Sequence, residues 1–234
     1  MKLKGLYIYF IFISLFGYSQ NPTSYVGGYI SINVVGTPKC VGTSIYDIKI
    51  VLDTHKDSLP TYSIKISTGD GVVDTAFKID SFMIGNQVMR SVYSLTHIYP
   101  GCGTYEITYT DTINKINTTN FPFPKSFFIS TTFSITPFVS AYSSPVFYDR
   151  HLMSSKNGDS IYYNVSVIDA GYDSLLYSFS DTAIIPNNML INKYSGEIRW
   201  EGVTNNSRNY IYVLVDKYKD GIKISASLKS FSIY

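Results

Sequence analysis

The stretch LTHIYPGCGTYEITYTD, residues 95–111, decides the fold class. After a turn-like segment, PGCG at 100–103, the side chains of Tyr105, Ile107 and Tyr109 alternate with polar ones. A period of two residues is typical of a β-strand with one buried face, and Pro and Gly mark a tight turn. The stretch therefore predicts a strand that begins directly after a turn.

The same alternation recurs along the chain and predicts an all-β protein. No apolar stripe with a 3.6-residue period and the length of a helix follows the N-terminal segment, and the 22 Tyr and 14 Phe suit pleated surfaces. The segment 136–145, rich in Pro, Ser and Thr, indicates a domain boundary. We expect two tandem Ig-like antiparallel β-sandwich domains, at 20–138 and 139–234. Strand-like runs occupy residues 46–52, 62–66, 105–109, 127–135, 161–167, 175–179, 198–200, 211–215 and 222–228.

The N-terminal segment has the layout of a signal peptide. Lys2 and Lys4 precede an apolar run at 6–16, which is too short for a membrane-spanning helix, and small residues follow at Gly17 and Ser19. We expect residues 1–19 to be removed before Gln20, with an uncleaved N-terminal anchor as the alternative. The mature protein is then secreted, to the periplasm or the cell surface, with no stable membrane insertion.

The charge of the mature chain argues against two classes of partner. Removal of Lys2 and Lys4 brings the formal net charge from +2 to zero, and only 15% of all residues are charged. Nucleic-acid binding needs clustered Lys and Arg, and anionic membranes attract polybasic segments. Neither pattern is present, so we expect no nucleic acid and no membrane surface among the partners.

Cys40 and Cys102 are the only cysteines of the chain. Export places them where disulfides persist, and Cys102 lies in a turn that is unlikely to bury a thiol deeply. We expect a Cys40–Cys102 disulfide, which would close a loop of about 60 residues. Two buried free thiols are the alternative.

Several motifs resemble a known family. Gly69-Asp70-Gly71 and THIYPGCGTYEITYTD at 96–111 are similar to the GDG turn and the strand entry of PKD-type Ig-like modules. The order of SYVGGYISINV at 24, YDIKIVLD at 46, PFPKSFFISTTFSITPF at 122, SSPVF at 143, DSLLYSF at 173, SGEIRW at 195 and DGIKISASL at 220 resembles the N-terminal region of gliding-motility-associated surface proteins of the Bacteroidota. The second half also looks like a putative-Ig or cadherin-like domain. The resemblance implies a surface module that acts in adhesion or in envelope or gliding-associated assembly.

One motif departs from this pattern. Family members read D-P-D-G-D-S-L, whereas this chain has a glycine in place of the middle aspartate, between Asp169 and Asp173. Calcium takes six to eight oxygen ligands, so the missing carboxylate weakens the site. Asp169 and Asp173 are therefore only weak calcium candidates, and we expect neither a metal nor another cofactor.

The sequence carries no catalytic motif. His55, His97 and His151 lack metal-ligand spacing, no G-x-S-x-G elbow is present, and no carboxylate pair stands out. His97 is expected to pack or hydrogen-bond near its strand, as its counterpart does in PKD-type modules. We expect a protein that is not an enzyme.

The aromatic residues suggest a binding role. Trp200 shares a strand face with Ile198 and is expected to anchor the second core. Tyr210, Tyr212 and Tyr218 are the candidate surface contacts with a ligand. We expect an exported, non-catalytic protein that contacts a protein or a glycan at the cell envelope, with a glycan-binding module that uses exposed aromatic and amide side chains as the alternative function.

Overall fold

The chain folds into β-strands alone in the part that the structure, a computed structural model, describes. The described residues are 24–58, 61–85, 87–112, 126–148, 152–153, 158, 160–169, 171, 174–181, 184–201 and 209–233. The predicted signal peptide at 1–19 lies outside them. The all-β prediction is confirmed, with strands β1 Tyr25–Val35, β2 Ser44–His55, β3 Ser63–Ser67, β4 Val73–Ile84, β5 Val88–Tyr99, β6 Gly103–Thr112, β7 Ser126–Ile135, β8 Val146–Phe147, β9 Leu152–Met153, β10 Ile161–Asn164, β11 Val167–Ile168, β12 Ser174–Phe179, β13 Met189–Ile191, β14 Glu197–Trp200, β15 Asn209–Lys219 and β16 Ile222–Ile233.

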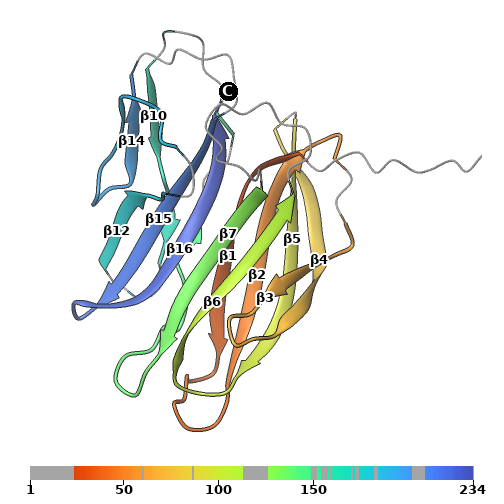
Figure 1. Cartoon of the computed structure of the whole chain (residues 1–234), viewed down its shortest axis with the longest axis vertical. Helices are drawn as coiled ribbons and strands as arrows, with labels where there is room; N and C mark the ends of the chain where they lie inside the picture. Colours follow the sequence, from red (N-terminus) through yellow and green to blue (C-terminus); the bar gives the residue numbers. More distant parts are fainter. Residues whose placement is uncertain are drawn as a thin grey trace, which may run out of the picture.

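Most strands belong to one large sheet. Its order is β1-β2-β5-β4-β3-β6-β7-β16-β15-β12, and β9 pairs in parallel with β16. A further pairing of β1 with β16, at Gly28 and Ser230, closes a ring that consists of β1 to β7 and β16. Figure 1 shows this ring as the larger part of the molecule, which we call the N-terminal lobe.

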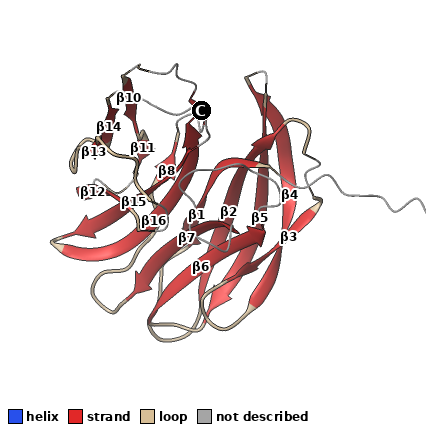
Figure 2. Cartoon of the chain, turned by 45° about the horizontal axis from the view of Figure 1, so that its top comes forward, coloured by secondary structure: helices blue, strands red, loops and turns tan. Residues whose placement is uncertain are grey.

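The second part of the molecule, the C-terminal lobe, consists of β8 and β10–β15. Two small sheets, β10-β14-β13 and β11-β8, lie beside the pair β12-β15 of the large sheet. Figure 2 shows these short strands gathered at one side of β15 and β16. Trp200 and Ile198 are both buried in this lobe, as predicted.

Strand β16 joins the two lobes. It pairs with β15 over its whole length, with β7 at Ser225–Ser227, and with β1. The predicted boundary at residue 138 falls in the loop between β7 and β8, but ladder hydrogen bonds connect the residues on either side of it. The strands of the large sheet therefore run through both lobes without a break.

Two hydrophobic cores lie on opposite faces of the sheet formed by β1, β2 and β5. Ile30, Ile48 and Ile50 point into the core of the N-terminal lobe, whereas Tyr29 and Val51 point into the core of the C-terminal lobe. Because successive side chains on a strand face opposite ways, one strand can serve both cores. This explains why β1 is buried along most of its length.

Candidate functional site

The predicted Gly69-Asp70-Gly71 turn connects β3 to β4 and packs against β6. Gly69 has a φ of +88°, and a Cβ atom there would lie 2.5 Å from the backbone nitrogen of Glu106. Only glycine accepts both the left-handed backbone and this close approach. The turn is thus fixed against β6, and the side chain of Asp70 is held in a defined place.

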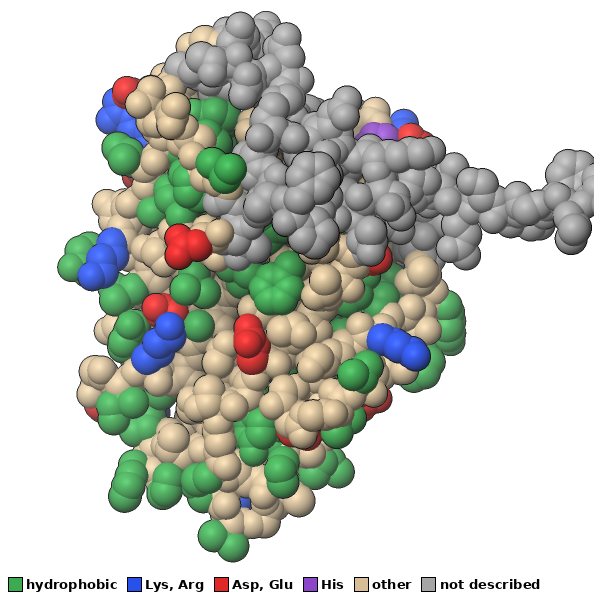
Figure 3. Space-filling model, viewed as in Figure 1, with side chains coloured by type: hydrophobic (Ala, Val, Ile, Leu, Met, Phe, Trp, Pro, Cys, Tyr) green, Lys and Arg blue, Asp and Glu red, His purple; other side chains and the backbone are tan. Residues whose placement is uncertain are grey.

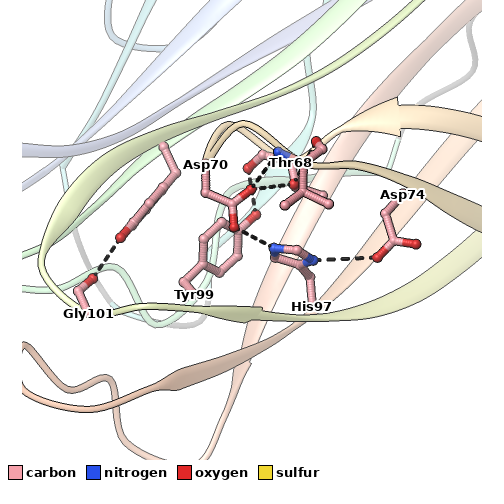
Figure 4. A network of polar contacts seen from close by, with 8 residues as sticks. Thr68, Asp70, Asp74, His97, Tyr99 and Gly101 are labelled. Atoms are coloured by element: carbon pink, nitrogen blue, oxygen red, sulfur yellow. Dashed lines mark hydrogen bonds and ion pairs between the residues drawn. The ribbon is translucent and has the colours of Figure 1, made fainter.

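Asp70 is the centre of a polar network, which Figure 4 shows. Its carboxylate accepts hydrogen bonds from the Thr68 hydroxyl at 2.6 Å and the Val72 backbone N–H at 3.3 Å. Its Oδ2 lies 2.8 Å from His97 Nε2, and Asp74 Oδ2 lies 3.5 Å from His97 Nδ1. The predicted hydrogen-bonding role of His97 is confirmed.

The surroundings of Asp70 favour its charged form. Burial alone would raise the pKa of the carboxyl, but the hydrogen bonds from Thr68, His97 and Val72 and the charge of His97 outweigh it and lower the pKa below its ordinary value of 3.8. The Tyr99 hydroxyl donates to the Thr68 carbonyl at 2.9 Å and extends the network into β5. The network therefore ties the turn to β5.

The predicted disulfide joins Cys40 and Cys102 across 62 residues of sequence. Next to it, Gly101 has a φ of +126°, and a Cβ atom at this position would lie 2.6 Å from the Cys40 carbonyl oxygen. The Tyr105 hydroxyl donates to the Gly101 carbonyl at 3.0 Å, four residues upstream. A tyrosine bonded back to the preceding turn is a device of Ig-like sandwiches. The disulfide and the Tyr105 bond together fix the entry to β6.

Asp169, a weak calcium candidate, forms an ion pair with Lys217. Its Oδ1 accepts a hydrogen bond of 2.6 Å from Lys217 Nζ, and the same ammonium donates to the Ser143 carbonyl at 3.1 Å. Both side chains are almost fully buried. The other candidate, Asp173, lies outside the described residues. Among the described residues no group of three or more His, Cys, Asp or Glu side chains could hold a metal ion.

Two of the three predicted contact tyrosines are in the interior. Tyr210 and Tyr212 are fully buried and pack with Leu228, on the face of β15 opposite to Ile211 and Val213. The prediction that these two rings are exposed is wrong, because β15 is covered on both faces and an alternating pattern does not reveal this. Tyr218, near the end of β15, is half-buried.

A cleft of about 700 Å³ at the junction of the lobes is the best candidate for a binding site. Its floor is the outer face of β1, β2 and β5, where the strand registers place side chains in cross-strand rows. Three such rows cross this face from the apolar to the polar end of the cleft, namely Tyr29–Val51–Val92, Ser31–Lys49–Ser94 and Asn33–Asp47–Thr96. The β1 and β2 members of these rows and Val92 of β5 border the cleft directly, whereas Ser94 and Thr96 do not.

The walls of the cleft expose large apolar side chains. Tyr148, directly after β8, and Ile168 of β11 are 76% and 55% exposed, and Phe82 of β4 on the other side is 43% exposed. Ser144, just before β8, connects the β8 side of the cleft to β1. Its hydroxyl accepts a hydrogen bond of 2.9 Å from the Ile32 N–H, and its own N–H donates to the Ile32 carbonyl at 3.1 Å. The cleft is therefore preformed on one side.

The charges around the cleft are few and partly paired. Arg90 forms a two-pronged ion pair with Asp53, with both N···O distances at 2.8 Å. Asp47 accepts a hydrogen bond of 2.7 Å from Thr96, and Lys49 of the middle row is exposed. On the molecular face shown in Figure 3, Lys and Arg side chains also lie singly rather than in a patch. The cleft thus offers apolar walls and hydrogen-bonding groups rather than a strong field.

Sequence reasoning missed this cleft, since its floor depends on β5 and its walls on β4 and β8. The segment 73–99 shows alternation only in part, because a bulge between Lys78 and Asp80 shifts the register of β4. Phe77, Ile79 and Phe82 are apolar residues of this segment that the structure exposes. Their deviation from the alternating pattern is the sequence feature that could have pointed to a binding surface here.

Comparison with known proteins does not assign the chain to a family. No protein-family model matches the chain, and no curated protein matches it significantly. Within the described ranges, none of the elements is a helix with the length and apolar character needed to cross a membrane.

Proposed function

We propose that this protein is an exported, non-catalytic binding module that acts in adhesion or in assembly of the cell envelope. The observation that carries the proposal is the cleft between the lobes, where exposed Tyr148, Ile168 and Phe82 surround a floor of hydrogen-bonding side chains. Binding sites are preferentially concave, largely apolar and located where two structural units meet. A cleft of about 700 Å³ lies within the usual range for such sites.

Export is supported by two features of the chain. The sequence begins with the layout of a signal peptide, and its only two cysteines are joined in a disulfide. Disulfides persist in the periplasm and outside the cell, where an envelope protein would work. Protease treatment of intact cells tests the location, because a surface protein is digested and a periplasmic one is protected.

A glycan is the second candidate partner for the same cleft. Asn33, Asp47 and Ser31 present amide, carboxylate and hydroxyl groups to the cleft, and Tyr148 supplies an exposed aromatic ring at the wall. Sugar hydroxyls pair with such polar groups, and aromatic rings offer them an apolar surface. Tyr148 and Phe82 thus replace the buried Tyr210 and Tyr212 as aromatic contact candidates.

The proposal predicts that the cleft is needed for attachment to envelope material. Beads coated with the purified protein should bind envelope fragments of the producing cells, and Tyr148→Ala should reduce that binding about tenfold, as expected for an aromatic residue that contacts the partner. The matched control is Tyr194→Ala, since Tyr194 is also 76% exposed but lies in the β13–β14 turn, away from the cleft.

Two outcomes would contradict the proposal. Equal losses with Tyr148→Ala and Tyr194→Ala would show that the cleft is not the contact surface. Reproducible turnover of a substrate by the purified protein, with or without added metals, would show an enzyme. A glycan array probed with the same two variants separates the partners, because only a glycan-binding cleft gives a Tyr148-dependent signal there.

A further inference from the structure

The ring of strands in the N-terminal lobe has an opening between β3 and β6. These two strands share a single ladder pair, Ser67 with Thr108, whereas β3 pairs along its whole length with β4 and β6 along its whole length with β7. From this pair the strands run on to Ser63 and to Thr110 with no further pairing between them. The strand ladder is therefore open at this place.

A pocket of about 260 Å³, with both polar and apolar lining, lies at this opening. Hydroxyl groups line it from several strands, including Ser63 at the β3 rim, Thr54 of β2 and Ser91 of β5. Leu52 and Ile64 add apolar surface. The pocket shares no residue with the cleft between the lobes, and it faces the opposite side of the sheet formed by β1, β2 and β5.

Two buried tyrosines and one carboxylate form the inner wall of the pocket. The Tyr25 and Tyr109 hydroxyls are 2.7 Å apart, and both bond to Asp111 Oδ2. The Tyr25 ring is stacked on Phe127 with ring centres 4.3 Å apart, and it meets the Tyr109 ring edge to face. Both hydroxyls are thus positioned by packing before any ligand arrives.

These hydroxyls stay protonated at all ordinary pH values. Burial is the main cause that raises the pKa of both tyrosines, and the Asp111 carboxylate raises them further. The single hydrogen of each phenol is engaged within the Tyr25–Tyr109–Asp111 group, so these oxygens offer a ligand acceptors, whereas the Ser and Thr hydroxyls around them can donate as well as accept. The pocket wall therefore suits a partner that itself both donates and accepts.

Size and charge narrow the class of ligand. The volume of the pocket is larger than the volume that one water molecule occupies in the liquid, about 30 Å³. It is just below the range of about 300 to 1,000 Å³ that is usual for pockets that bind drug-sized ligands. Its lining holds one acid, Asp111, and one base, Lys65 at the rim, so it has no net formal charge. A small neutral molecule rich in hydroxyl groups fits these conditions better than an ion does.

We propose that the pocket between β3 and β6 binds one uncharged sugar ring or a small polyol. The ring enters between Ser63 and Thr110, its hydroxyls exchange hydrogen bonds with the pocket hydroxyls and with Asp111, and its apolar face contacts the tyrosine rings. This site goes beyond the proposed function, since it is separate from the cleft that contacts the envelope partner.

Saturation-transfer NMR on the purified protein tests the site directly. The probes are glucose, galactose, mannose, N-acetylglucosamine and glycerol, each at millimolar concentration. We expect transfer to at least one of them, and an affinity about tenfold lower in Tyr109→Phe, which keeps the ring and removes one hydroxyl. Ser63→Phe at the rim should block the pocket and abolish transfer, whereas Tyr194→Ala in the β13–β14 turn should leave it unchanged.

The results separate the possible occupants. No transfer to any probe would overturn the proposal and leave water as the occupant. Equal transfer in the wild type and in Ser63→Phe would also overturn it, because the sugar would then bind elsewhere. If Tyr109→Phe fails to fold, judged by its melting curve, Ser63→Phe still decides the outcome. Loss of sugar transfer in Tyr148→Ala instead would assign the sugar to the cleft.

Discussion

At the scale of single residues, two polar side-chain pairs fix segments that are distant in sequence. Asp70 binds His97 across 27 residues, and Lys217 binds Asp169 across 48. Each pair is largely buried, so its carboxylate depends on the partner side chain and on neighbouring hydrogen bonds. Substitution of one of these residues should therefore change the free energy of unfolding strongly.

Asp70→Asn should lower stability and change its dependence on pH. The folded-state pKa of Asp70 is below its ordinary value of 3.8, so its contribution is complete above about pH 4 and is lost as the pH falls through the lower folded value. We expect a loss of about 1.5 to 3 kcal/mol at pH 7, as for hydrogen bonds to charged groups. Urea unfolding at pH 7 and pH 3 checks this, and an equal loss at both values would contradict it.

Lys217→Met should destabilise the protein by about 3 to 5 kcal/mol, because it leaves the Asp169 carboxylate buried without its cation. The double variant Lys217→Met with Asp169→Leu should recover much of this loss, since no charge is then buried. Lys223→Ala is the control, because Lys223 is 46% exposed where it pairs with Asp216, and exposed pairs contribute at most about 1 kcal/mol. Urea unfolding compares the variants, and similar losses for Lys217 and Lys223 would disprove the buried role.

At the scale of elements, strand periodicity locates most strands but not their partners. The run 161–167 reads as one strand, yet the structure divides it into β10, which pairs with β14, and β11, which pairs with β8. The break at 165–166 lets the chain pass from one small sheet to the other. The entry to β6 is simpler, because the Pro-Gly-Cys-Gly turn, the disulfide and Tyr105 all act on the same few residues.

Removing the disulfide should weaken this entry. Crosslinking residues 62 apart lowers the entropy of the unfolded chain by an amount equivalent to at most about 4 kcal/mol in the chain-entropy model. We expect Cys40→Ser with Cys102→Ser to lose about 2 to 4 kcal/mol of unfolding free energy. A peptide map without reductant should show one linked pair, and two thiols that react with an alkylating agent in the folded protein would refute the bridge.

At the scale of the whole molecule, β16 decides how the two lobes relate. This strand supplies Ile224 to the core of the N-terminal lobe and Phe231 to the core of the C-terminal lobe. It also pairs with β7 on one side and with β15 on the other. The lobes therefore share both hydrogen bonds and apolar contacts, which independent tandem domains do not.

We expect the protein to unfold in one cooperative transition. Loss of either lobe would expose the shared strand and part of the other core, so neither lobe should be stable alone. Calorimetry of the full chain should give one peak, and a fragment of residues 20–138 should lack a cooperative melt because it has no β16. Two separate peaks, or a fragment that melts cooperatively, would support two independent sandwiches.

The sequence by itself determined the all-β fold, the strand that follows the Pro-Gly-Cys-Gly turn, the partnership of Cys40 and Cys102 and the burial of Trp200. These features are local, because alternation, turn residues and a lone pair of cysteines can be recognised without knowing what surrounds them. Only the tertiary structure decided that Tyr210 and Tyr212 are buried, that Lys217 neutralises Asp169, and that the cleft and the pocket lie on opposite faces of one sheet. Each of these depends on which strands become neighbours, and side-chain alternation specifies a strand's two faces but not what covers them.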